Sequence, residues 1–184
     1  MEGGHHLILG ELTDILTGET IPDTHDERYR QKIASILLRQ KGYSKDDIRS
    51  RREIMVAAGE KRAILKVDFE IFSGEKTLMV IQYGPGSLLT RRRPALALAR
   101  LAARGEVPVV VVTNGEDAEI LDGQTGEASA RGPGAIPSRR ALFEKWEDRP
   151  LASLDETRLD LEGRIAYAYE VDGACPCDDS ICRL

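Results

Sequence analysis

Apolar residues recur at helical spacing after a capping signal near the start of the chain. Thr24 and Glu27 form the T-x-x-E pattern of a capping box, in which each side chain bonds a backbone N–H at the other end of the first turn. The positions that then share one helical face are Tyr29, Ile33, Ile36, Leu37 and Gln40. The pattern predicts a helix that ends at the Gly42-Tyr43 pair.

Two stretches with a period of two follow, after a short helical turn that "SKDD" predicts, and they indicate a β-hairpin. In "AILKVDFEIF", residues 63–72, we expect one face to carry Leu65, Val67, Phe69 and Ile71, and the other to carry Ile64, Lys66, Asp68, Glu70 and Phe72. Asp68 is therefore expected on the less apolar face. The turn "SGEK" leads into "TLMVIQYG", where Gln82 and Gly84 share a face because they are two residues apart.

The next elements predict a helix and a buried strand. Thr90 is a candidate cap for a helix that runs to Arg104, with Pro94 inside its first turn and Gly105 as the stop. "VPVVVVT" is apolar throughout, as in a strand that is buried on both faces. An Asn-Gly turn, the strand "AEILD" and the turn "GQTGE" complete the pattern, which predicts a mixed β-sheet flanked by helices.

The end of the chain predicts further helices. The loop "GPGAIPS" leads into a short helix around Trp146, and "LDETRLDLEGRIAYAYEV" predicts a C-terminal helix. We expect one domain over residues 1–150, followed by this helix and a cysteine-containing tail over residues 151–184.

Composition places the chain among ordinary globular proteins. Its 184 residues are 31% charged and 41% hydrophobic, with a formal net charge of -5. The apolar run "VPVVVVT" is far shorter than the roughly 20 residues of a membrane span, and "MEGGHHLILG" lacks the basic and apolar regions of a signal peptide. We therefore expect a cytoplasmic protein with no membrane partner.

Basic residues gather in short runs despite the acidic net charge. The runs are "RSRRE" at 49–53, "EKR" at 60–62, "TRRRP" at 90–94 and "SRR" at 138–140. Each of them can be an ordinary solvated surface. Arg91, Arg92 and Arg93 stand at the start of a predicted helix, however, where positive charge opposes the helix dipole. That placement favours an anionic partner such as phosphate.

Four segments together resemble a known nuclease family over roughly residues 8–130. They are "DERYRQKIASILLRQKGY", "VDFEIF", "LMVIQYGPG" and "VPVVVVTNGEDAEILDGQTGE". The chain resembles the N-terminal domain of type I restriction enzyme R proteins, in the stand-alone form of that family within the PD-(D/E)XK nuclease superfamily. The resemblance implies an α/β fold with a restriction-endonuclease-like core.

The resemblance also implies which residues would form a catalytic centre. The first acid of the motif falls on Asp68, the second acid and the lysine fall on Gln82 and Gly84, and an assisting helix acid falls on Glu27. Only Asp68 and Glu27 keep the expected residue type. Mg²⁺ prefers oxygen ligands, so Asp68 and the Gln82 carbonyl would hold it weakly or not at all, and Gly84 supplies no cation.

Other side chains are candidates to replace the missing groups. Lys66 and Glu70 share the expected strand face of Asp68, although both are most simply explained as charges on an exposed face. The catalytic candidates are thus Asp68, Gln82, Glu27, Lys66 and Glu70. The candidates for contacting nucleic acid are Arg91, Arg92, Arg93, Arg51 and Arg52.

All three cysteines lie in the last ten residues, which argues against a disulfide framework. Cys175, Cys177 and Cys182 form C-x-C-x4-C, a spacing that can serve zinc or an iron–sulfur cluster. A fourth ligand would have to come from His5, His6, an acid or another chain. We therefore expect a lightly packed tail in preference to a Zn or Fe–S site.

Three classes of function stay open at this point. The first is a degenerate nuclease that contacts DNA without cleaving it, and this is the interpretation we carry forward. The second is an active Mg²⁺-dependent endodeoxyribonuclease with a rearranged site. The third is an assembly subunit, for which a homodimer is one arrangement. Because one fold hosts many activities, the resemblance alone does not choose among them.

Overall fold

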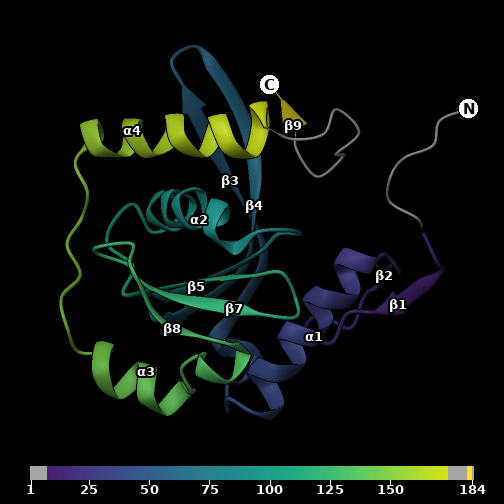
Figure 1. Ribbon diagram of the computed structural model, residues 1–184. Coiled ribbons are helices and arrows are strands. Elements are labelled where there is room, and N and C mark those ends of the chain that lie inside the picture. The colour runs from purple at the N-terminus through teal and green to yellow at the C-terminus, as the bar shows by residue number, and fades with distance from the viewer. Residues whose placement is uncertain (1–7, 174–181, 184) are drawn as a thin grey trace, which may run out of the picture.

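A computed structural model describes residues 8–173 and 182–183 (Figure 1). The strands are β1 (Glu11–Thr13), β2 (Thr20–Pro22), β3 (Ile48–Ala58), β4 (Lys61–Ser73), β5 (Lys76–Tyr83), β6 (Val109–Thr113), β7 (Ala118–Asp122), β8 (Ala128–Arg131) and β9 (Cys182–Arg183). The helices are α1 (His25–Arg39), α2 (Leu88–Ala103), α3 (Arg139–Trp146) and α4 (Glu156–Tyr167). Short helical turns are η1 (Lys45–Asp47), η2 (Pro133–Ala135) and the π-helical η3 (Ala168–Asp172).

The main sheet is mixed, as expected. Its order is β3-β4-β5-β6-β7-β8, and β9 pairs with β4 beside this path. All neighbours are antiparallel except β5 and β6, which run parallel because α2 connects them as a crossover. The α/β architecture with helices on both faces is consistent with a restriction-endonuclease-like core.

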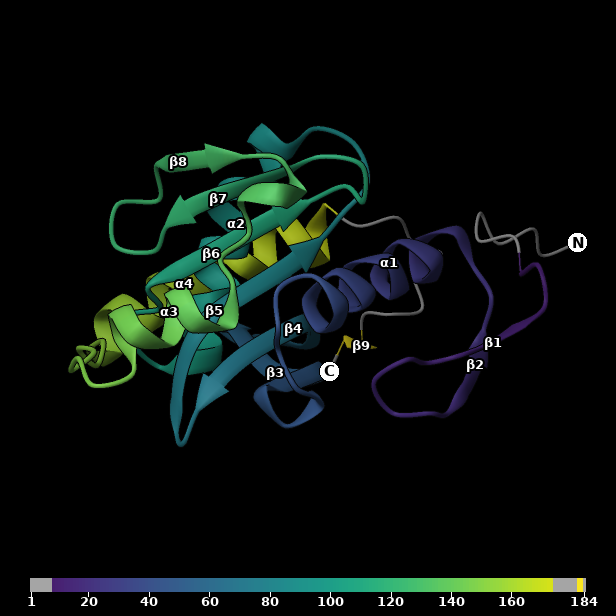
Figure 2. The ribbon, with the colours of Figure 1, turned by 90° about the horizontal axis from the view of Figure 1, so that it is seen from below.

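Helices cover the two faces of this sheet and enclose two apolar clusters. In Figure 1, α2 and α4 lie above the sheet and α1 and α3 below it, and Figure 2 shows α1 and α3 on the near side when the molecule is viewed from below. The first cluster joins the sheet to α2 and α4, and the second joins it to α1 and α3. Strands β3 to β7 contribute residues to both clusters, so the sheet separates the two apolar layers.

Several predicted elements are confirmed, and one helix starts earlier than expected. Thr24 caps α1 by accepting from the Glu27 N–H, and Ser44 and Asp47 form the capping box of η1. Helix α2 was expected to follow Thr90, but it begins at Leu88 after Ser87. Pro94 therefore lies in its second turn. Strands β1, β2, β8 and β9 were not predicted.

Strand β4 does not keep one apolar face, which corrects the expected alternation. Leu65 and Val67 pack in the cluster with α2, whereas Phe69 and Ile71 pack in the cluster with α1. The change of face falls at Asp68. Opposite Asp68 in β3, Arg51 has a left-handed backbone with φ 51°. Such a conformation is uncommon outside glycine and turns the strand locally.

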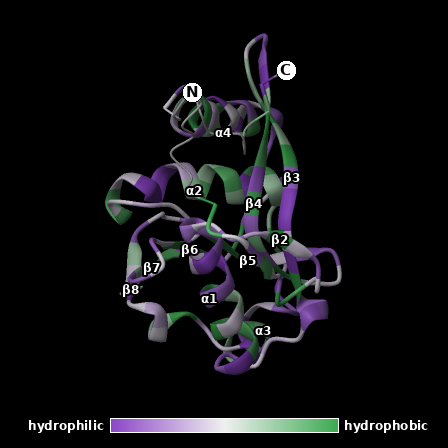
Figure 3. Ribbon diagram, turned by 90° about the vertical axis from the view of Figure 1, so that its right-hand side faces the viewer, coloured by the Kyte–Doolittle hydropathy of each residue, from purple (hydrophilic) through white to green (hydrophobic). Residues whose placement is uncertain are grey.

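Helix α4 packs closely on the rest of the fold. A Cβ placed on Gly163 would come within 2.5 Å of the Ala57 carbonyl oxygen, so this glycine allows α4 to approach β3. Figure 3 shows both hydrophobic and hydrophilic segments along α4, as expected for a helix with one buried side. None of the described helices has the length and apolar character needed to cross a membrane.

Candidate functional site

The candidate site lies where β4 and β5 stop pairing. The ladder between these strands ends at the Phe69 and Ile81 pair, and Asp68 is the next residue of β4. Asp68 is 4% exposed. Its Oδ2 accepts the Tyr83 N–H at 2.8 Å, and its Oδ1 accepts from Nε of Arg30 at 2.6 Å. Both carboxylate oxygens therefore have strong partners within the protein.

The Gln82 side chain lies in the same opening between β4 and β5 and bonds to the backbone of β4. Its Oε1 accepts the Asp68 N–H at 3.3 Å, and its Nε2 donates to the Lys66 carbonyl at 3.1 Å. The side-chain amide thus bonds to one backbone donor and one backbone acceptor of β4. The carbonyl oxygen that was expected to face a metal is used in this contact.

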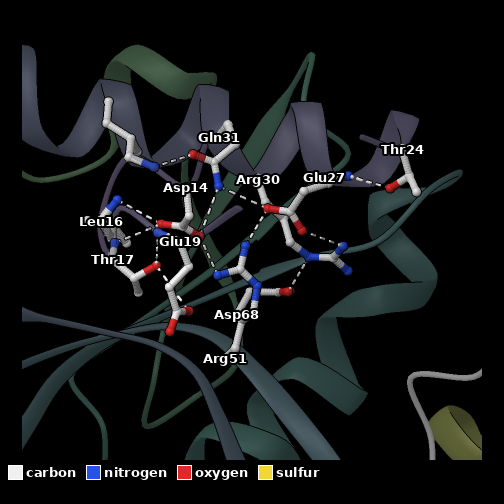
Figure 4. Close-up of polar contacts among 11 residues, drawn as sticks. Asp14, Leu16, Thr17, Glu19, Thr24, Glu27, Arg30, Gln31, Arg51 and Asp68 are labelled. Atoms are coloured by element: carbon white, nitrogen blue, oxygen red, sulfur yellow. Dashed lines mark hydrogen bonds and ion pairs between the residues drawn. The ribbon is translucent and has the colours of Figure 1, made fainter. Parts of the chain in front are cut away.

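Two further carboxylates approach from α1 and from the segment between β1 and β2 (Figure 4). Arg51 donates to both Glu27 and Asp14, and Gln31 Nε2 donates to Glu27 at 2.9 Å and to Asp14 at 3.1 Å. Three acids from separate elements, Asp14, Glu27 and Asp68, therefore surround the two guanidinium groups of Arg30 and Arg51. Of the residues named from the sequence, Glu27 and Asp68 both lie beside Arg30, whereas Gln82 bonds to the backbone of Asp68.

Opposing influences act on the acids of this cluster. Burial alone would raise the pKa of Asp14, but the Thr17 N–H, the Arg51 guanidinium and the Leu16 N–H outweigh burial and lower it. For Asp68, burial dominates and raises the pKa, although Arg30 and the Tyr83 N–H act in the other direction. Asp14 therefore favours folding as a carboxylate, whereas ionisation of Asp68 in the folded protein has a cost that Arg30 reduces.

We expect Asp14→Asn to lower the free energy of unfolding by roughly 1–3 kcal/mol at neutral pH, because Arg51 loses a charged partner. The lowered pKa means that the unfolded state binds the proton first as pH falls. The contribution of Asp14 is thus present above its unfolded pKa of about 4 and is lost as pH falls through its lower folded value. Urea titrations of both proteins at neutral and strongly acidic pH should show the difference shrinking in acid.

The matched control for this prediction is Asp160→Asn, which removes a half-exposed carboxylate paired with Arg164 on α4. Such a pair contributes no more than about 0.5 kcal/mol. A difference between wild type and Asp14→Asn that stays constant with pH would mean that the charge of Asp14 has no part in stability.

The remaining catalytic candidates lie in different surroundings. Lys66 is exposed and its Nζ lies 3.8 Å from a Glu53 carboxylate oxygen. Glu70 is fully buried, which corrects the expectation of an exposed charge. It accepts from Nη1 of Arg52 at 2.8 Å on both oxygens, and from the Thr77 hydroxyl. Glu70 is therefore a structural acid held away from the Asp68 opening.

The candidate nucleic-acid arginines of α2 each contact an acid. Arg92 donates to both oxygens of Glu119 at 2.6 and 2.7 Å. Arg93 lies 2.6 Å from an oxygen of the buried Glu162, and Arg91 lies 3.5 Å from Glu170. The two candidates on β3, Arg51 and Arg52, are paired as described above.

Arg91 has a second contact that the sequence did not indicate. A Cβ placed on Gly84 would lie 3.0 Å from Cζ and Nε of Arg91, so the guanidinium rests directly on this glycine. Gly84 is the position at which the resemblance places a lysine. A cation from α2 thus stands beside the place where the motif lacks one.

The donor set does not fit a Mg²⁺ ion in this arrangement. Arg30 Nε lies 2.6 Å from Asp68 Oδ1, where a metal would be bound, and Gln82 Oε1 accepts a backbone N–H. Within residues 8–173 and 182–183, no group of three or more His, Cys, Asp or Glu side chains is placed to hold a metal. Cys182 is exposed and free, whereas His5, His6, Cys175 and Cys177 lie outside the described residues.

Three residues of the cluster were missed from the sequence. Arg30 follows Glu27 by three positions on α1, which places it on the same side of the helix, and this spacing was the available signal. Gln31 and Asp14 carried no such signal, because the short strands β1 and β2 that position Asp14 were not predicted.

Comparison with known proteins adds one match. A family model described as the type I restriction enzyme R protein N terminus matches residues 25–137. No curated protein matches the chain. No solved structure matches it either. The matched range includes α1, the β3–β8 sheet and α2, and it leaves β1, β2, α3 and α4 outside.

Proposed function

This chain belongs to the family of the type I restriction enzyme R protein N terminus, and on that premise we propose that it is a degenerate nuclease that contacts nucleic acid without cleaving it. The family supports the relation to nucleases. The loss of cleavage and the retention of nucleic-acid binding are the proposal.

The observation that carries the loss of cleavage is the 2.6 Å contact between Arg30 and Asp68. In a nuclease of this type, an acid at the Asp68 position would hold Mg²⁺. Here the Arg30 guanidinium compensates the charge of Asp68, and the single guanidinium of Arg51 is shared between Asp14 and Glu27. A divalent cation at this place would be repelled by the two guanidinium groups, so metal binding is disfavoured.

The same charge balance supports contact with phosphate. An uncompensated group of three carboxylates would repel a nucleic-acid backbone. Arg30 and Arg51 remove most of that repulsion, and their side chains are 27% and 30% exposed. We propose that the backbone passes over this partly compensated centre and the nearby start of α2.

The proposal is tested with plasmid and labelled oligonucleotides, at several salt concentrations and with Mg²⁺ or Mn²⁺. We expect binding whose log affinity falls linearly with log salt, with a slope of about −2 to −3 for two or three phosphate contacts. We expect no metal-dependent cutting. Cutting by wild type that disappears in Asp68→Ala would overturn the non-cleaving proposal.

One observation favours a second candidate, an active endodeoxyribonuclease with a rearranged site. Arg91 stands over Gly84, where it can supply the cation that the motif lacks. That candidate needs Arg30 to leave Asp68, and the cutting assay above decides it. Absence of both cutting and binding would favour the assembly role, for which the mass of the particle in solution tests a homodimer. A cytoplasmic location is part of the proposal, because DNA would be the partner.

A further inference from the structure

We propose that Arg91 is a phosphate-contacting residue of the candidate centre, and that Glu170 occupies the place of the phosphate in the unbound protein. The proposal rests on the nucleic-acid contact proposed above, and it adds a specific residue and an intramolecular competitor. It starts from Gly84, the residue that follows the last residue of β5, Tyr83.

Gly84 lets a guanidinium approach the backbone at this point. Any side chain would begin within 3.0 Å of Cζ and Nε of Arg91 and would displace them. The preceding N–H, that of Tyr83, donates to Asp68 at 2.8 Å. Arg91 therefore lies next to the residues that form the Asp68 opening, although it comes from α2.

Of the three arginines at the start of α2, Arg91 is the one that can most readily exchange its acidic partner for a phosphate. Arg92 and Arg93 hold their acids at 2.6 Å, whereas the Arg91 contact with Glu170 is 3.5 Å long. The Arg91 side chain is 36% exposed, about as much as that of Arg93, so the length of the contact is what distinguishes it. A long, partly exposed ion pair contributes little net stability. A phosphodiester can make a shorter and bidentate contact with the same guanidinium.

Glu170 is placed to act as the competitor. It lies in η3, the π-helical turn that continues α4, and so outside the range matched by the family model. The segment after residue 137 thus brings a carboxylate to an arginine of the matched domain. Binding of phosphate at Arg91 requires Glu170 to give up this contact, so the carboxylate lowers the affinity for nucleic acid.

The test compares full-length variants by fluorescence anisotropy with labelled duplex and single-stranded DNA. Arg91→Ala is expected to weaken binding about tenfold and to reduce the magnitude of the salt slope by about one. Glu170→Gln is expected to strengthen binding by about three- to tenfold, because the competitor loses its charge. In the double variant, Glu170→Gln should give no gain over Arg91→Ala alone.

Asp172→Asn is the matched control. It removes the same charge two residues further along η3, from a carboxylate that lies 3.7 Å from Lys61. Equal gains from Glu170→Gln and Asp172→Asn would overturn the proposal, because they would reflect net charge alone. Unchanged affinity in Arg91→Ala, with wild type binding DNA, would also overturn it.

A second readout separates this inference from the proposed function. Inorganic phosphate is titrated into arginine-labelled protein, and the Nε–Hε resonance of Arg91 is followed by NMR. We expect it to shift, and to shift at lower phosphate concentration in Glu170→Gln. Such a shift without any DNA binding would refute the proposed function and leave the Arg91 site standing. An unaffected Arg91 resonance in both proteins would refute the Arg91 site itself.

Discussion

Combining Gln82→Glu and Gly84→Lys with Arg30→Ala is expected to create Mg²⁺-dependent plasmid nicking at least about 100-fold above wild type. The first two changes restore the carboxylate and the cation that the family motif places there. The third removes the guanidinium that lies 2.6 Å from Asp68. Without Arg30, the buried carboxylate of Asp68 lacks a compensating positive charge. A divalent cation is then expected to bind there, because it supplies that charge.

The same triple variant gives a readout that does not depend on cleavage. Mg²⁺ or Mn²⁺ should raise its melting temperature, since a ligand that binds only the folded state stabilises it, whereas the melting temperature of wild type should not respond. Adding Asp68→Ala should abolish both effects. A triple variant that folds, as judged by circular dichroism, but neither binds metal nor nicks DNA would contradict the idea of a disarmed nuclease.

Glu162→Ala is expected to destabilise the protein by about 3–5 kcal/mol and to lower its melting temperature by about 10 °C. Glu162 is fully buried on α4. Its oxygens lie 2.6 Å from Arg93, 2.9 Å from Arg100 and 2.9 Å from Arg158. Arg100 is itself buried on α2, so removal of the carboxylate leaves its charge without compensation.

The stabilisation that Glu162 provides is expected to decrease as pH falls. Burial alone would raise the pKa of Glu162, but Arg93 and Arg100 outweigh burial and lower it. The stabilisation is therefore present above the unfolded pKa of about 4.3 and is lost as pH falls through the lower folded value. Thermal unfolding of wild type and Glu162→Ala should converge in acid.

Glu156→Ala is the control in the same helix. Its carboxylate lies 2.6 Å from Arg104, but both side chains are largely exposed, and such pairs contribute less than about 1 kcal/mol. Equal effects of the two substitutions would mean that the buried cluster between α2 and α4 has no special role.

Local signals predicted much of the fold because they act within a few residues. The capping pairs at Thr24 and Ser44 gave the starts of α1 and η1, and the apolar run "VPVVVVT" gave the buried parallel strand β6. The start of α2 was displaced because Ser87 and Thr90 both have the residue type of a cap, and only Ser87 has that position. Strands β1 and β2 were missed because each has three residues, too few for a period of two to be visible.

The roles named for the site residues stay predictions, and their contacts were not foreseen. Glu27 and Asp68 both lie beside Arg30, and Gln82 bonds to the backbone of Asp68. The partners of these acids could not be foreseen, because ion pairs join residues far apart in the sequence. Arg30 and Asp68 are 38 positions apart, and Arg92 and Glu119 are 27 apart. The change of face in β4 at Asp68 was also not foreseen, and it lies opposite the left-handed backbone of Arg51 on the neighbouring strand.

The guanidinium resting on Gly84 makes substitutions at positions 84 and 91 depend on their order. A lysine introduced at position 84 while Arg91 is in place must first push away Cζ and Nε, which lie 3.0 Å from its Cβ. Shortening Arg91 removes the three nearest atoms that a Cβ at position 84 would meet. The steric cost of a side chain at position 84 therefore depends on the residue at position 91, and the Arg91 guanidinium must shift by a few tenths of an ångström before a lysine fits there.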